Sequence, residues 1–176
     1  MLFRVDPDPG PQCPKIVRMI VEIPQHSTNK YEYDFKLGVF KLSRTLYSPM
    51  HYPGDYGFIP GTISEDNDPL DVLTLVTAPT FTGCLYDVRP VGVLDMLDVN
   101  EQDHKILAVP NRDPRMADTA SIEDLPGHVK TELEHFFNIY KELEGKPTKI
   151  EGWRGIDAAY EVIESSRQRY VTSNPA

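Results

Sequence analysis

Prolines, glycines and acidic turn residues divide the first two thirds of this chain into short segments, which leaves little room for long helices. The chain has 16 prolines and 11 glycines in 176 residues. Apolar, β-branched runs that close on such turn residues cover 16–24, 71–78, 84–97 and 104–110. Runs of this length and composition favour strands over helices. The first two thirds of the chain is therefore predicted to be β-rich.

Three further features complete the prediction for this part of the chain. Residues 30–35 alternate charged and aromatic side chains, and 37–44 follow across Gly38, so the two runs predict a hairpin. Residues 48–62 hold three prolines and three glycines among aromatic side chains, which indicates an irregular but packed loop. Residues 110–119 are predicted to form an exposed loop that leads into helical sequence.

The last third of the chain carries helical periodicity. Apolar residues recur at spacings of four, three, four and three, at Val129, Leu133, Phe136, Tyr140 and Leu143. Ser121 and Asp124 resemble a helix start, although Pro126 can move the first turn. Gly145 with Pro147 supplies a stop. One amphipathic helix is expected between these signals.

A second helix is predicted over about 156–170 from its apolar residues, which are Ile156, Ala159, Tyr160, Ile163 and Tyr170. Strands followed by helices indicate the α+β class, here a small β-barrel with helices packed outside it. The length suits one domain. We predict a Pro-rich N-terminal arm over residues 1–15 and a single domain over 16–171.

Charge and hydropathy exclude several functions. The net charge is −9 and the pI is near 5.0, whereas nucleic-acid affinity comes mainly from Lys and Arg. Nucleic acid is therefore not an expected partner. No run reaches the roughly 18 apolar residues of a membrane span, and no signal-peptide core is visible, so a cytoplasmic location is expected. Cys13 and Cys84 have no metal-binding spacing and are predicted to be reduced thiols.

The segment EDNDPLDVL (65–73) crowds carboxylates into a turn that leads into apolar sequence. Asp66, Asp68 and Asp71 are hard oxygen donors, and Pro69 restricts the backbone between them. Divalent cations would neutralise such a group, but a solvated acidic turn is an alternative from this segment alone. An EF-hand calcium loop does not match, because Asp71 stands where that loop needs glycine and Thr77 where it needs glutamate.

A second acidic group strengthens the metal interpretation. Asp98 and Asp103 flank VNEQ at a predicted strand end, so closure of a barrel could bring them beside the first turn. Two more acids, Glu22 and Glu32, lie upstream. Interleaved with the acids are cations and phenols, namely Lys30, Arg44, Tyr52, Tyr56, Lys105, Tyr140 and Lys141. Carboxylates for magnesium, together with cations and hydroxyls for phosphate oxygens, form the combination that a phosphate site needs.

Five segments occur in the same order as their counterparts in a known family: KYEYD, YPGDYGFIP, EDNDPLDVL, RPVGVLDMLD and HFFNIYKELE. With them the chain resembles the soluble family I inorganic pyrophosphatases over roughly residues 16–165. The resemblance implies an OB-like five-stranded barrel with two flanking C-terminal helices. It also implies magnesium-dependent hydrolysis of inorganic diphosphate, as its magnesium complex, to two phosphates, in a homohexamer.

The resemblance implies a role for each matching position. Asp66, Asp71 and Asp103 would hold the metals that activate water, with Asp71 bridging two of them. Asp98 and Asp103 would hold a further magnesium that arrives with substrate. Glu32 would contact another ion, Glu22 would support the ligands, and Asp68 would be the general base. The positions matching phosphate-binding residues are Lys30, Arg44, Tyr56, Lys105, Tyr140 and Lys141, with Tyr52 lining the site.

Two alternatives stay open at this point. A divalent-metal or phosphate-binding protein without turnover could use the same fold and the same carboxylates. An enzyme that cleaves nucleotide phosphoanhydrides could use the same metals, but the chain lacks GxxxxGK[ST] and GxGxxG, so no familiar nucleotide cradle supports it. The five histidines show no HExxH spacing, and no catalytic role is assigned to them.

Overall fold

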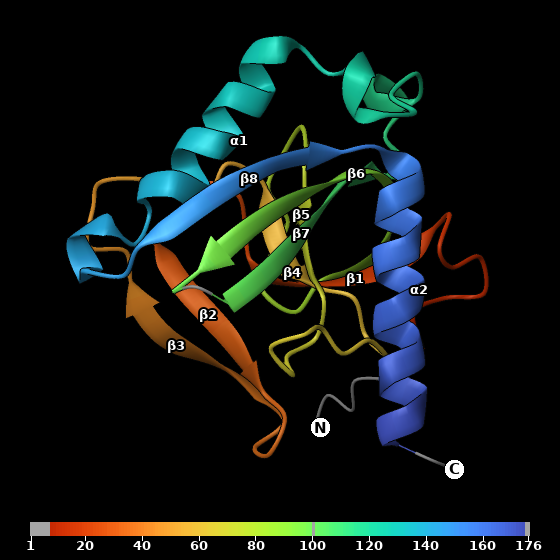
Figure 1. The fold of residues 1–176 in the computed structure, drawn as a ribbon, viewed down its shortest axis with the longest axis horizontal. Helices are drawn as coiled ribbons and strands as arrows, with labels where there is room; N and C mark the ends of the chain where they lie inside the picture. Colours follow the sequence, from red (N-terminus) through yellow and green to blue (C-terminus); the bar gives the residue numbers. More distant parts are fainter. Residues whose placement is uncertain (1–7, 100, 175–176) are drawn as a thin grey trace.

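Five strands close into a ring at the centre of the molecule. The computed structural model describes residues 8–99 and 101–174 (Figure 1). The ring strands are β1 (Val17–Ile23), β4 (Asp55–Phe58), β5 (Asp71–Thr74), β7 (Glu101–Pro110) and β6 (Leu85–Asp98), in that spatial order. The first part of β6 pairs with β1 and closes the ring. The predicted α+β fold with a five-stranded barrel is confirmed.

The predicted hairpin is confirmed and lies outside the ring. It consists of β2 (Asn29–Asp34) and β3 (Val39–Thr45), which form a separate two-stranded sheet. Its register places Lys30 directly opposite Arg44. Figure 1 shows the hairpin projecting beside the ring rather than continuing it. Contacts with other parts of the chain must therefore fix where its side chains lie.

Both predicted helices are present and pack on different sides of the ring. They are α1 (Gly127–Ile139) and α2 (Ile156–Ser173), and Figure 1 shows α2 along one side and α1 at another. Short 3₁₀ turns are η1 (Pro114–Met116), η2 (Ile122–Asp124) and η3 (Glu142–Glu144). The expected start signal at Ser121 caps η2, and α1 begins directly after Pro126.

Two strands were not predicted, and one predicted helix position is wrong. β4 lies inside the predicted loop 48–62; all four of its residues are buried, and a Cβ on Gly57 would stand 2.0 Å from the Ile20 carbonyl oxygen. β8 (Thr148–Arg154) pairs with the second half of β6. Its residues are only partly buried or exposed, and its sequence has no long apolar run that would have predicted a strand. Leu143 continues the apolar stripe of α1 by spacing, but it lies in η3 and is 64% exposed.

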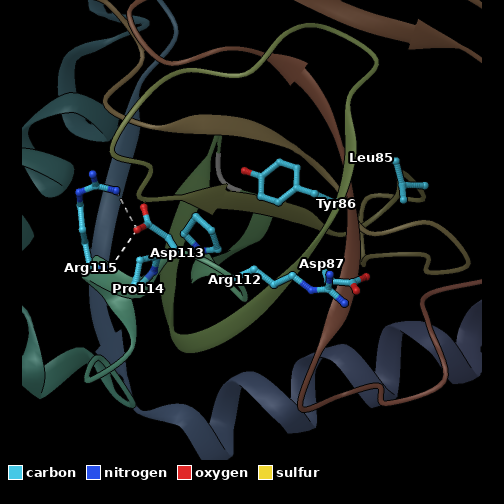
Figure 2. A pocket seen from close by; sticks show the side chains of 8 residues that line it. Leu85, Tyr86, Asp87, Arg112, Asp113, Pro114 and Arg115 are labelled. Atoms are coloured by element: carbon cyan, nitrogen blue, oxygen red, sulfur yellow. Dashed lines mark hydrogen bonds and ion pairs between the residues drawn. The ribbon is translucent and has the colours of Figure 1, made fainter.

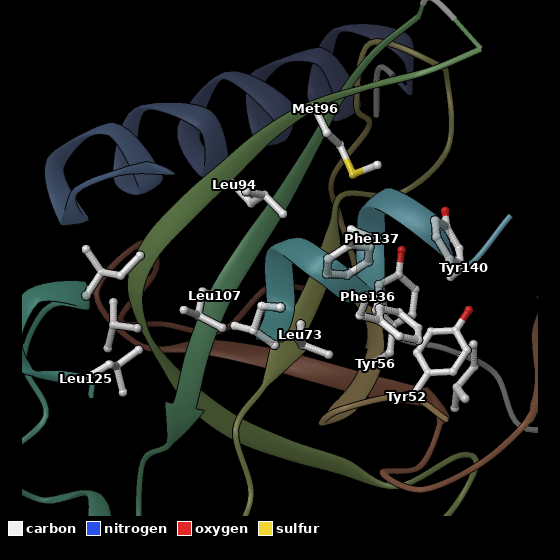
Figure 3. Close-up of a cluster of buried hydrophobic side chains, with 14 of the residues drawn as sticks. Tyr52, Tyr56, Leu73, Leu94, Met96, Leu107, Leu125, Phe136, Phe137 and Tyr140 are labelled. Atoms are coloured by element: carbon white, nitrogen blue, oxygen red, sulfur yellow. The ribbon is translucent and has the colours of Figure 1, made fainter. Parts of the chain in front are cut away.

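The core divides into two clusters. One fills the space between the ring and α1, and Figure 3 shows Tyr52, Tyr56, Phe136 and Tyr140 gathered at one end of it. The other packs the ring against α2 and reaches Cys13 and Cys84, which are free thiols. No helix within the described residues is long and apolar enough to cross a membrane.

The described part of the predicted arm lies against the start of β1. Asp8 pairs with Arg18 at 3.0 Å, and the Arg18 backbone N–H donates to the Pro9 carbonyl at 2.9 Å. The rest of the arm, residues 1–7, lies outside the described residues.

Candidate active site

The acidic turn between β4 and β5 is held by its own backbone and by one buried anchor. The Ser64 N–H donates to the Asp68 carbonyl at 2.7 Å, and the Asp68 N–H donates to Asp66 Oδ1 at 3.0 Å. Asn67 takes a left-handed conformation, with φ of 69°, which asparagine tolerates better than most residues. Leu70 is fully buried behind the turn. The sequence therefore fixes a compact turn that exposes the Asp66 and Asp68 carboxylates.

Two cavities meet at this turn. The first, of about 240 Å³, has as its charged and hydroxyl-bearing lining Glu22, Lys30, Glu32, Tyr33, Tyr56, Asp66, Asp68 and Asp71. The second, of about 310 Å³, has as its polar lining Asp66, Asp98, Glu101, Gln102, Asp103, Lys141 and Lys146. Asp66 lines both cavities. The structure thus brings the two acidic groups together across the closed ring.

Strand register places a buried cation between carboxylates. β5 and β7 are parallel, and Asp71 pairs with Lys105. Lys105 Nζ forms ion pairs with Asp71 and, at 2.7 Å, with Asp103, which lies on the same face of β7. The Tyr56 hydroxyl donates to Asp71 Oδ2 at 2.5 Å. Asp71 is therefore contacted by a cation and by a hydroxyl donor.

Burial and neighbouring charge shift the pKa values in this group. Asp68 is exposed, but its neighbours partly desolvate the carboxylate; this partial burial, followed by the charges of Asp66 and Asp71, raises the pKa of Asp68 above its ordinary value. Burial also raises the pKa of Asp103, against the pull of Lys105. Burial opposes a charge on Lys105, but its carboxylate neighbours, Asp71 foremost, outweigh it and raise the lysine pKa well above the ordinary value.

Cations from three parts of the chain face these acids. Lys30 donates to Glu32 Oε1 at 2.7 Å; burial would raise the pKa of Glu32, but this hydrogen bond and charge lower it. Lys141, just after α1, forms an ion pair with Asp98. Arg44 on β3 donates from Nε to Glu144 Oε1 at 2.7 Å.

Two buried polar atoms have no hydrogen-bond partner among the described side chains, and both belong to predicted site residues. They are Asp98 Oδ1 and Arg44 Nη2. A buried acceptor or donor without a partner costs about 1–3 kcal/mol, so native structures rarely keep one without a reason. The acceptor suits a cation and the donor suits an anion. This is the observation that most directly marks the region as a ligand site.

The donor set fits magnesium in chemistry, although it is not arranged as a coordination shell. Within residues 8–99 and 101–174, no three His, Cys, Asp or Glu side chains converge closely enough to hold a metal ion. Lysines instead contact Asp71, Asp98 and Asp103. All the predicted ligands are carboxylates, the hard oxygen donors that Mg²⁺ prefers, and Asp98 keeps one unused oxygen.

The predicted tyrosines form one aromatic cluster, in which Tyr56 lines the first cavity whereas Tyr52 and Tyr140 are buried and line neither cavity. The Tyr52 and Tyr56 ring centroids are 5.3 Å apart, and Phe136 lies 5.0 Å from Tyr52 and 5.3 Å from Tyr140 (Figure 3). Burial raises the pKa of Tyr52 and of Tyr56 well above the ordinary value. These hydroxyls therefore stay protonated at neutral pH and are able to donate hydrogen bonds.

Glu22 joins the ring to the hairpin. Its Oε1 accepts a hydrogen bond from the Tyr33 backbone N–H at 2.7 Å, and burial raises its pKa from 4.5 to about 8. The side chain also lines the first cavity. The structure thus places Glu22 where it supports the strand that carries Lys30 and Glu32.

Glu22 should make the stability of the metal-free protein depend on pH. The folded chain keeps the Glu22 proton up to about pH 8, whereas the unfolded chain loses it near pH 4.5. The stability contributed by Glu22 is therefore full below pH 4.5 and is lost as the pH rises toward 8. The free energy of unfolding of wild type minus that of Glu22→Gln should fall by about 1.4 kcal/mol per pH unit in this window. A constant difference from pH 5 to 8 would contradict this.

Sequence reasoning missed Glu144 and Lys146. Glu144 contacts Arg44, and Lys146 lines the second cavity and lies 3.8 Å from Glu144 Oε2. Arg44 and Glu144 are a hundred positions apart, so no spacing in the sequence connects them.

A larger cavity elsewhere holds none of the predicted residues. Figure 2 shows this cavity, of about 680 Å³, lined by Leu85, Tyr86, Asp87, Pro110 and residues 112–115. One of its two acids, Asp113, already accepts hydrogen bonds from the Thr77 hydroxyl and the Arg115 N–H. Size alone therefore does not identify the site; the combination of acids, cations and unpaired polar atoms does.

Comparisons with known proteins show which family the chain resembles in sequence and in structure. A family model described as inorganic pyrophosphatase matches residues 19–171. The chain is 50% identical to an inorganic pyrophosphatase of Geobacillus stearothermophilus over 156 residues, covering 89% of this chain and 94% of that one. It is 49% identical to one from Halalkalibacterium halodurans, covering 89% and 96%. Among solved structures, an inorganic pyrophosphatase from Thermus thermophilus matches with a TM-score of 0.91 at 45% identity, covering 93% of this chain and 95% of that one.

Proposed function

Because the chain belongs to the soluble family I inorganic pyrophosphatases, we propose that it hydrolyses inorganic diphosphate to two phosphates with Mg²⁺ as its cofactor. One observation carries the proposal: two carboxylate-lined cavities adjoin at Asp66, with cations on their walls. A diphosphate bound with magnesium needs both kinds of group at once.

Five carboxylates would hold the metal ions: Asp66, Asp71, Asp98, Asp103 and Glu32. When bound, Mg²⁺ would neutralise substrate charge and lower the pKa of the attacking water. The lysines already offset part of the negative charge of the site's own carboxylates, since Lys105 contacts two of the acids and Lys141 contacts a third. The net charge of −9 would otherwise repel a polyanionic substrate.

Asp68 would be the general base. It lines the first cavity, is exposed, and forms no ion pair among the described residues, whereas Asp71 and Asp103 are both held by Lys105. A carboxylate without a cation partner is free to accept a proton from a water attacking phosphorus in line. Its neighbour Asp66 accepts the Asp68 backbone N–H and thereby orients the turn.

Cations and hydroxyls would bind the phosphate oxygens and stabilise the departing phosphate. Arg44 offers a buried N–H group that no acceptor within residues 8–99 and 101–174 uses. Lys30 lies across the hairpin from it, and Tyr52, Tyr56, Lys105, Tyr140 and Lys141 supply further donors.

The proposal has a quaternary and a cellular part, both of which rest on the family. We propose a cytoplasmic homohexamer. The Pro-rich arm over residues 1–15, ahead of a single domain over 16–171, stays a prediction from composition.

Diphosphate should be a far better substrate than ATP. With Mg²⁺, phosphate release from ATP is expected to be about 100-fold slower than from diphosphate. In ATP a bulky nucleoside is esterified to the phosphate chain in place of an oxyanion, and the two small adjoining cavities do not accommodate it. A colorimetric phosphate assay at equal substrate and metal concentrations measures both rates. Equal rates would identify a general phosphoanhydride hydrolase, and metal binding without any release would identify a binding protein.

A further inference from the structure

Glu144 is the contact that fixes the Arg44 side chain. The Arg44 Nε donates to Glu144 Oε1 at 2.7 Å, and the Glu144 side chain is only 5% exposed. Figure 1 shows the turn after α1, which contains Glu144, at the end of β3, where Arg44 lies. The ion pair therefore connects the hairpin to the body of the protein.

Local structure holds Glu144 in place. It is the last residue of η3, and Gly145 ends this turn in a left-handed conformation with φ of 70°. Thr148 then begins β8, and the pairing of β8 with β6 fixes the chain directly after the turn. The carboxylate is thus presented by a turn tied to the ring.

Arg44 needs such a contact because its own strand does not place it. Among the described residues the hairpin strands pair only with each other, and the contact of Glu22 with the hairpin is made to Tyr33 on β2. An arginine side chain also carries about 2 kcal/mol of rotamer entropy that is lost when it is fixed. Binding at Nε fixes the plane of the guanidinium group. The Nη2 atom then remains buried without a hydrogen-bond partner in the part of the chain that the structure describes.

A purely structural ion pair would not leave this donor unused. Carboxylates commonly take arginine through two parallel hydrogen bonds, whereas Glu144 Oε1 takes only Nε. The other carboxylate oxygen lies 3.8 Å from Lys146 Nζ, and Lys146 lines the second cavity. Glu144 therefore forms ion pairs with two cations, and it leaves Arg44 Nη2 without a partner among the described residues.

We propose that Glu144 is a positioning residue that holds Arg44 so that its free guanidinium edge binds a phosphate oxygen of diphosphate. This inference rests on the proposed function. Glu144 itself does not touch the substrate; it acts through Arg44.

A double-mutant cycle tests whether Glu144 acts through Arg44. Glu144→Ala should lower kcat/KM for diphosphate by about 10- to 100-fold, because a binding group misplaced by an ångström loses most of its effect. In the Arg44→Ala background the same change should cost less than about twofold. Glu144→Gln, which keeps an acceptor oxygen, should restore most of the loss.

The control is Glu164→Ala, which removes an exposed ion pair with Arg167 on α2 and should leave kcat/KM unchanged. Equal losses in both Arg44 backgrounds would overturn the positioning role. If Glu144→Ala lowers the melting temperature below the assay range, Glu144→Met carries the cycle, because it keeps most of the side-chain volume and removes both acceptor oxygens; equal losses in both Arg44 backgrounds would again overturn the positioning role.

The proposed diphosphatase function and the positioning role of Glu144 can be contradicted independently of each other. A wild-type protein that releases no phosphate would contradict the function, and the cycle is then measured as Kd for inorganic phosphate by calorimetry. Loss of phosphate affinity in Glu144→Ala that disappears in the Arg44→Ala background would still support the positioning role, and additive losses of affinity would overturn it.

Discussion

Replacing Lys105 with methionine is expected to lower the free energy of unfolding of the metal-free protein by about 3–5 kcal/mol. The side chain is 6% exposed and contacts both Asp71 and Asp103. Methionine fills much of the same volume but leaves two largely buried carboxylates facing each other without a cation. Chemical denaturation in chelating buffer measures the change.

Magnesium should return part of this loss. If Asp71 and Asp103 bind Mg²⁺, added metal neutralises them and stabilises the Lys105→Met variant more than it stabilises wild type. The matched control is Lys41→Met, whose exposed ion pair with Asp34 on the hairpin should contribute less than about 1 kcal/mol. If Lys105→Met costs no more than this control, the buried cation does not stabilise the acidic group, and the electrostatic account of the site is wrong.

Much of the fold follows from local pattern. The apolar run of β6 and the apolar stripe of α1 are visible in the sequence, because each element buries a continuous face. β4 escaped prediction because four residues, one of them Gly57, give no pattern, and pairing with β1 makes them a strand. β8 escaped because it carries charged side chains on its exposed positions.

The sequence predicts which types of residue belong to the candidate site, but not which side chains contact one another. Acidic and basic positions stand out in the sequence, and ring closure brings Asp66 beside Asp98 and Asp103 as expected. The ion pair of Arg44 with Glu144 spans a hundred positions and depends on where the hairpin lies, which no local pattern encodes. The unpaired atoms of Arg44 and Asp98 likewise appear only in three dimensions.

The largest effect on activity is expected from Asp68→Asn. Asparagine keeps the shape of the side chain but cannot accept a proton, so kcat should fall by about 100- to 10,000-fold. Because Asp68 is exposed, the free energy of unfolding should change by less than about 0.5 kcal/mol. The matched control is Glu65→Gln in the same turn; Glu65 pairs with Arg169 at 3.1 Å and does not line either cavity. Its kcat should stay within about twofold of wild type.

The measurement that tests the central claim most directly is phosphate release from diphosphate by wild type and by Asp68→Asn, started in chelator and continued after Mg²⁺ is added. We expect no release before the addition, two phosphates for each diphosphate afterwards in wild type, and almost none in the folded variant. Release by wild type without divalent metal, or equal release by Asp68→Asn, would contradict a magnesium-dependent hydrolysis with Asp68 as base.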